Sequence, residues 1–241
     1  MNDNQSGETP RIEVTAAASA EAAWQALRDP GAIRQWHGWD ADEIEAEIDS
    51  IYFTDVVEEA DRRTLVANGG DRFDIQPNGD GVQITLTRAP LSGNPDWDAY
   101  YDDVTEGWTS FLHQLRFALE RRPGMTRRTL YFADRGTYSG TVIDRLGLDA
   151  VAGQPRGSRY TATIAGEDVA GEVWFRSAHQ LGVTVDAWGE GLLVIAGTAP
   201  SDADPAGTSM AILSTYGLEN ADFGQLDTRW AGWWADHRAG E

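Results

Sequence analysis

The feature that most constrains this chain is a long helical pattern that closes each of its halves. Between residues 102 and 122, apolar residues recur with the period of an amphipathic helix. They share one face of that helix and are Trp108, Phe111, Leu112, Leu115 and Leu119. Acidic residues crowd its first turn and Arg121 and Arg122 its last, as the helix dipole favours, and Pro123-Gly124 ends it. Another such pattern near the C-terminus carries Phe223, Leu226, Trp230, Trp233 and Trp234.

Before the first long helix, the sequence favours a strand, short helices and then an antiparallel sheet. Arg11–Ala16 predicts a strand, and Ser19 caps a helix that runs through Arg28, followed by a short helix over 31–36. Alternation over 44–52 and 82–87, around a hairpin turn at 77–81, is typical of a sheet with one covered face.

The second half repeats this order of elements loosely. A short helix is expected over 141–146, and strands are expected over 129–132, 160–164, 172–176, 182–188, 191–196 and 209–216. The repeated order predicts two α+β domains, at 11–122 and 129–241. A linker at 123–128 joins them, and the polar residues 1–10 are expected to be disordered.

Composition narrows the classes of function. The 241 residues suit one large domain or two small ones, and 39 acidic against 19 basic residues give a net charge of −20. This charge repels phosphate backbones and excludes nucleic acid as an expected partner. Cysteine is absent, which removes disulfides and thiolate chemistry. With no membrane-spanning stretch and no secretory signal in its first residues, the sequence predicts a cytoplasmic protein.

Two motifs in the first half resemble a known superfamily. One motif resembles the opening of the helix-grip (START-like, SRPBCC) superfamily and consists of Ile12-Glu13-Val14, Ala23-Trp24, Leu27-Arg28-Asp29-Pro30, Ile33 and Trp36. The other motif resembles the terminal helix of one branch, the homologues of the activator of heat-shock protein 90 ATPase, and consists of Gly107–Leu112, Leu115 and Leu119-Glu120. Together they cover residues 11–122. The second half matches no motif closely, so only its order of elements suggests a divergent second copy.

The resemblance implies an antiparallel sheet curled around the long C-terminal helix, often with an apolar cavity between them. The side chains expected to line that cavity, and so to bind a ligand, come from the sheet and the helix and are Ile48, Tyr52, Phe73, Ile75, Ile84, Leu86, Trp108, Phe111, Leu112 and Leu115. The same spacing would serve a plain packed core, so cavity and core are alternatives. The presence of 10 tryptophans favours a pocket slightly.

The sequence offers little for catalysis or metal binding. The histidines are isolated at 37, 113, 179 and 237, so no metal site and no cofactor are expected. No nucleophile elbow or dinucleotide loop is present. Acidic and aromatic residues gather before the long helix: Asp96, Trp97, Asp98, Tyr100, Tyr101, Asp102, Asp103 and Glu106. We interpret them as charging of the helix start and a solvated loop, and the alternative is a cavity mouth or a rim that docks a partner.

Three hypotheses of function follow. The leading one is non-catalytic binding of a small hydrophobic ligand in a helix-grip cavity, with coupling to a protein partner left open. The second is a polyketide cyclase/aromatase-like enzyme, as other tandem helix-grip proteins are. It needs an acid or base facing the cavity, and the candidates Tyr52, Asp74 and His113 have no partner visible in the sequence. The third is a chaperone-associated interaction module with filled cores.

Overall fold

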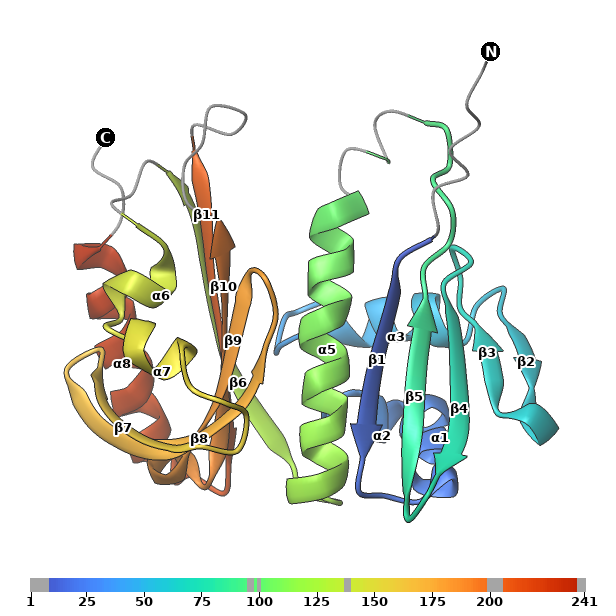
Figure 1. Ribbon diagram of the computed structural model, residues 1–241, viewed down its shortest axis with the longest axis horizontal. Helices are drawn as coiled ribbons and strands as arrows, with labels where there is room; N and C mark the ends of the chain where they lie inside the picture. Colours follow the sequence, from blue (N-terminus) through green and yellow to red (C-terminus); the bar gives the residue numbers. More distant parts are fainter. Residues whose placement is uncertain (1–8, 95–97, 99–100, 137–139, 199–205, 238–241) are drawn as a thin grey trace. The chain divides into compact units, whose positions relative to one another are not determined.

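The computed structural model describes residues 9–94, 98, 101–136, 140–198 and 206–237 (Figure 1). The chain divides into two compact units, Met1–Gly124 and Met125–Glu241, which we call the first and second units. The division lies within the stretch 123–128 that the sequence suggests as a linker, although a strand of the second unit already begins at Arg127. Of the residues expected to be disordered, 1–8 lie outside the described residues.

The first unit combines an antiparallel sheet with helices on one of its faces. Along the chain its elements are β1 (Arg11–Ala16), α1 (Ala20–Arg28), α2 (Pro30–Ile33), α3 (Ile44–Tyr52), β2 (Val57–Glu59), η1 (Ala60–Arg62), β3 (Thr64–Val66), β4 (Arg72–Asn78), β5 (Gly81–Thr87) and α5 (Tyr101–Arg121). The described strands pair in the order β1-β5-β4-β3-β2. Ser19 caps α1 as the sequence predicts, because its side chain accepts a hydrogen bond from the Ala22 amide.

The core of the first unit lies between the sheet and the helices. Strand side chains alternate between faces, so Val82, Ile84 and Leu86 of β5 point into a cluster that includes Trp108 and Leu112 of α5. The opposite face of the same strands is polar. The sheet therefore has one apolar face packed into the core, as the alternation predicts, and one polar face on which Thr64 and Thr85 are also buried.

The second unit repeats this plan with longer strands. Its elements are β6 (Arg127–Gly136), α6 (Val142–Arg145), α7 (Asp149–Ala152), β7 (Arg159–Ile164), β8 (Glu167–Arg176), β9 (Gln180–Val185), η2 (Asp186–Trp188), β10 (Gly191–Thr198), β11 (Gly207–Tyr216) and α8 (Asn220–Asp236). The described strands pair in the order β6-β11-β10-β9-β8-β7. Leu226 and Trp230 of α8 pack into one cluster with Leu193 and Leu213 of the sheet. Figure 1 shows β7 and β8 curving towards this helix.

The predicted fold class is confirmed: the chain is α+β, with two helix-grip units, each an antiparallel sheet with a long C-terminal helix packed on it. In the second unit, one predicted strand ends earlier than the sequence suggests. The strand expected over 182–188 ends at Val185, and Asp186–Trp188 forms a turn of 3-10 helix instead.

The prediction of a strand over 44–52 is wrong, because this stretch forms the helix α3. Ile44, Ile48 and Tyr52 are its buried residues, and a spacing of four places them on one face of either a helix or a strand. A strand would also have buried Ala46 and Ser50, which are exposed. Ile48 and Tyr52 therefore reach the core from a helix and not from the sheet.

Candidate functional site

The ten residues predicted to bind a ligand come together in the core of the first unit. They belong to one cluster in which nine are buried and Phe111 is half-buried. Four elements supply them: α3 (Ile48, Tyr52), β4 (Phe73, Ile75), β5 (Ile84, Leu86) and α5 (Trp108, Phe111, Leu112, Leu115). Their convergence fits both alternatives, a packed core and the wall of a ligand site. Ligand contact at these residues stays a prediction.

Aromatic rings dominate one part of this core. We call them the ring cluster, and it consists of Trp36, His37, Trp39, Tyr52, Phe73, Trp108 and Phe111. The His37 and Phe111 ring centroids lie 4.8 Å apart, and those of Phe73 and Trp108 lie 5.4 Å apart. Trp39 and Phe111 are half-buried, with centroids 6.4 Å apart. The ring cluster therefore reaches the surface at these two side chains.

A chain of hydrogen bonds enters the ring cluster from the surface. Glu47 is about half exposed, and its Oε1 lies 3.1 Å from Nε2 of His37. Nδ1 of His37 lies 2.9 Å from the Tyr52 hydroxyl, and both of these side chains are buried. A carboxylate only accepts, so in the neutral ring Nε2 carries the proton, Nδ1 accepts, and Tyr52 donates. Glu47, His37 and Tyr52 thus form a directed relay.

The pKa values in this relay are shifted in opposite directions. Burial, followed by the charges of Glu47 and Asp71, raises the pKa of Tyr52 well above its ordinary value. The hydrogen bond from His37 lowers the pKa of Glu47, against a smaller effect of burial. Tyr52 is therefore held as a neutral phenol and Glu47 as a carboxylate around neutral pH.

Another polar group lies in the same core, around the carboxylate of Asp71. Its oxygens accept hydrogen bonds from Nε of Arg88 at 3.0 and 3.1 Å, from Nε1 of Trp108 at 2.8 Å and from the Ala89 amide at 2.8 Å. The Arg88 guanidinium also donates to the carbonyl of Tyr101, in the first turn of α5. This ion pair joins the residues just before β4 and just after β5 to α5, and it fixes the orientation of the Trp108 indole.

Sequence reasoning named Tyr52 but missed its link to His37 and Glu47, and it missed the separate ion pair of Asp71 and Arg88. His37, Glu47, Asp71 and Arg88 lie on four separate segments, and no short motif links them. The only local signal is that His37 stands between Trp36 and Trp39, in a stretch whose aromatic residues favour burial.

The other acid or base candidates lie elsewhere. Asp74 is hydrogen-bonded to Arg72 and Thr64, its neighbours in β4 and β3, and the bond from Arg72 is the main cause of its lowered pKa. His113 is half-buried on α5. In the acidic stretch, Asp98 accepts from the Ser92 and Gly93 amides, whereas Asp96, Trp97 and Tyr100 lie outside the described residues.

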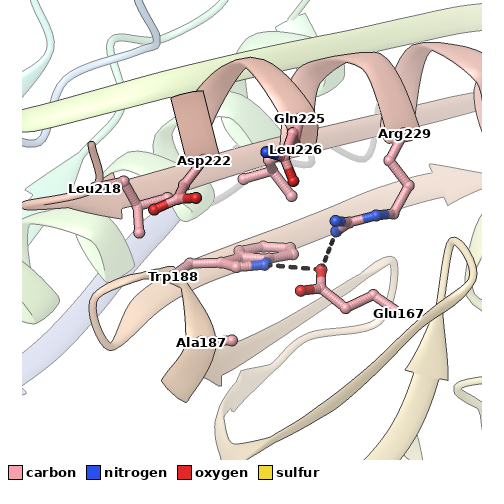
Figure 2. A pocket seen from close by; sticks show the side chains of 8 residues that line it. All are labelled: Glu167, Ala187, Trp188, Leu218, Asp222, Gln225, Leu226 and Arg229. Carbon is pink, nitrogen blue, oxygen red and sulfur yellow. Dashed lines mark hydrogen bonds and ion pairs between the residues drawn. The ribbon is translucent and has the colours of Figure 1, made fainter. Parts of the chain in front are cut away.

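The second unit contains a pocket of about 230 Å³ (Figure 2). It lies between the start of β8, the turn η2 and the first half of α8. Its lining consists of Glu167, Ala187, Trp188, Leu218, Asp222, Gln225, Leu226 and Arg229. None of these residues belongs to the set predicted from the sequence.

Neither a metal centre nor a membrane-spanning helix is found among the described residues. In this part of the chain, no group of three or more His, Asp or Glu side chains is placed to hold a metal ion. Among the same residues, no helix is long and apolar enough to cross a membrane.

Among known proteins, this chain is similar to several solved structures. No protein-family model matches the chain, and no curated protein sequence matches it. DynU16, a protein of the dynemicin biosynthetic locus, matches with 14% identity over 94% of this chain and 95% of its own, at a TM-score of 0.33.

Two di-domain ARO/CYC proteins match similarly. StfQ of the steffimycin pathway is 12% identical, over 92% of this chain and 91% of its own, with a TM-score of 0.33. BexL of the BE-7585A pathway is 9% identical, over 96% of this chain and 99% of its own, with a TM-score of 0.32. Identities and TM-scores this low carry no functional information, so the function proposed below rests on this chain's own residues.

Proposed function

We propose that this chain binds a small hydrophobic molecule in its first unit, between α5, α3 and the sheet, without catalysing a reaction. The observation that supports the proposal is the ring cluster, which holds buried polar groups and reaches the surface at Trp39 and Phe111.

Burying charged groups such as Asp71 and Arg88 in an apolar core is energetically unfavourable, so their presence calls for an explanation. Taking Asp71 and Arg88 out of water costs free energy that their mutual attraction often fails to recover, and an apolar core of the same volume is frequently as stable. A core that served packing alone would not require them. Polar groups placed among aromatic rings are, however, what orients a largely apolar ligand.

The relay defines which ligand group would be recognised. When Nδ1 of the neutral His37 ring accepts the hydrogen bond from the Tyr52 hydroxyl, the hydroxyl oxygen keeps a lone pair that can accept a hydrogen bond from a ligand. A hydroxyl on an otherwise apolar molecule fits this acceptor. Rotation of the half-buried Trp39 and Phe111 side chains would admit the molecule, since surface side chains change rotamer readily.

An environment-sensitive apolar dye tests the proposal on the full chain. We expect the wild type to bind the dye and Phe111→Ala to change its affinity several-fold. The matched control is Phe53→Ala, because Phe53 is also a half-buried ring on this core but packs under the Arg28 guanidinium. Absence of dye binding to the wild type, or equal changes in both variants, would overturn the proposal.

An alternative candidate is a polyketide cyclase/aromatase-like enzyme. The observation that favours it is the relay itself, because Tyr52 has the partners that general acid-base chemistry requires. A short poly-β-keto thioester separates the two candidates. Formation of a cyclised product that Tyr52→Phe abolishes, with dye binding retained, would establish the enzyme. No product from a chain that binds the dye supports the non-catalytic proposal.

The chaperone-associated interaction module gains no support. The large apolar side chains that are exposed among the described residues lie on separate segments: Val57, Leu91, Val104, Met125 and Tyr131. A large contiguous apolar patch would mark a docking surface for a protein, and these side chains come from five different stretches of the sequence. The likeness of residues 11–122 to homologues of the activator of heat-shock protein 90 ATPase stays a prediction from two sequence motifs.

A further inference from the structure

The pocket of the second unit has a mainly polar lining, with the edges of two buried apolar side chains at its base and charged side chains at its rim. Trp188 and Leu226 are each only 2% exposed and form its base. Three charged side chains surround them, with Glu167 and Asp222 negative and Arg229 positive. Figure 2 shows the Trp188 ring lying beneath α8, between Asp222 and Glu167.

The hydrogen bonds at the rim leave negative charge available. Oε2 of Glu167 accepts both from Nε1 of Trp188, at 3.3 Å, and from the Arg229 guanidinium. Arg229 is therefore neutralised within the pocket. Within the described part of the chain, the other oxygen of Glu167 has no hydrogen-bond partner, and the Asp222 carboxylate has none either.

The charge of the lining selects a class of ligand. Two carboxylates and one guanidinium leave the pocket with a net charge of about −1, in a chain of net charge −20. An anion would meet a guanidinium that is already paired, next to an unpaired carboxylate. An ammonium group would instead donate to the free carboxylate oxygens, and an indole side chain attracts cations as well.

We propose that the pocket formed by β8, η2 and α8 binds a small organic cation, a primary or secondary ammonium carried on an apolar body. Asp222 and the free oxygen of Glu167 hold the ammonium, while Trp188, Leu218 and Leu226 contact the apolar part. This site lies in a different unit from the hydrophobic site proposed above and does not depend on it.

Three probes of one shape test the charge preference: phenethylamine, 2-phenylethanol and phenylacetate. Binding to the full chain is followed through the indole N–H resonance of Trp188, which Trp188→Phe identifies. About 0.15 M salt screens general attraction to this acidic chain. We expect phenethylamine to bind at least about ten-fold more tightly than the neutral and anionic probes.

Two carboxylate variants on the same helix localise the site. We expect Asp222→Asn to weaken phenethylamine binding about ten-fold, which corresponds to losing one charge-assisted contact. Asp227→Asn is the matched control, because Asp227 is exposed on α8 but does not line the pocket, and it leaves the affinity unchanged. The proposal fails if the three probes bind equally, if none binds, or if both variants lose affinity alike.

Discussion

The two units share one architecture, and in each an ion pair accepts a hydrogen bond from an indole N–H, but the two pairs differ in burial. In the first unit the ion pair Asp71–Arg88 lies inside the core, with side chains 13% and 7% exposed. In the second unit the pair Glu167–Arg229 lies at the edge of a pocket, with side chains 24% and 33% exposed. The same combination of sheet and closing helix can therefore carry its polar groups inside or at the rim, and the sites we propose follow this difference.

The indole N–H groups show the same contrast. In the first unit, Nε1 of Trp36 donates to the Ala26 carbonyl and Nε1 of Trp108 to Asp71. In the second unit, Nε1 of Trp188 donates to Glu167, but Nε1 of the fully buried Trp230 has no hydrogen-bond partner in the part of the chain that the structure describes. In the first unit an indole N–H of the closing helix thus donates to a carboxylate next to the sheet, whereas in the second unit Arg229 makes the polar contact from α8 to β8 and Trp230 contributes its aromatic surface.

The largest expected difference between the units concerns their ion pairs. Asp71→Asn leaves the Arg88 charge buried without compensation, so we expect a loss of about 3–5 kcal/mol of unfolding free energy. Glu167→Gln breaks the more exposed pair and is expected to lose no more than about 1 kcal/mol. Urea unfolding of the full chain measures both. Equal losses would show that burial does not distinguish the two pairs.

A smaller difference is expected for two half-buried phenylalanines. Phe111 lies where the ring cluster reaches the surface, and Phe111→Ala should cost the transfer of its ring, about 1.5–3 kcal/mol. Phe132 of β6 is equally half-buried, but its ring stacks on Trp230 and Trp234, so Phe132→Ala also removes these packing contacts and should cost about 3–5 kcal/mol. If Phe111→Ala costs as much as Phe132→Ala and the wild type binds no apolar dye, the first unit has a filled core.

Two conservative tryptophan changes isolate the indole N–H. Trp108→Phe and Trp230→Phe remove a similar ring area, but only the first takes a donor away from the Asp71 carboxylate. We expect Trp108→Phe to cost about 1–3 kcal/mol more than Trp230→Phe. Thermal unfolding of both variants checks this difference. A larger loss for Trp230→Phe would show that its N–H has a partner in solution.

The smallest expected effect is on how the free energy of unfolding changes at acidic pH. The pKa of Glu47 is lowered in the folded chain, mainly by its hydrogen bond to His37. Its contribution is therefore present above the pKa of the unfolded chain and is lost as the pH falls through the lowered folded value. We expect Glu47→Gln to remove this part of the acid dependence in pH-dependent unfolding. A profile unchanged by Glu47→Gln would contradict the relay.

The elements that the sequence predicted well are those with an unambiguous period. The helix at 102–122 shows apolar residues at spacings of three and four together, which only a helix places on one face. The stretch 44–52 failed because Ile44, Ile48 and Tyr52 share a spacing of four, which both periods satisfy. The alanine and the glutamates of this stretch favour a helix, and this helix propensity distinguishes α3 from a strand where the spacing does not.

The sequence by itself determined the class of fold, the two closing helices and the ten apolar residues that meet in the first unit. The closing helices follow from local periodicity, because the side that an element buries is encoded in its own residues, whereas Ile48 and Tyr52 were expected on a strand and reach the core from α3. Only the tertiary structure decided that Glu47, His37 and Tyr52 form a relay, that Asp71 joins Arg88 to Trp108, and that Glu167, Asp222 and Arg229 rim one pocket. Those side chains come from different elements, and their contacts exist only once the sheets and helices have packed.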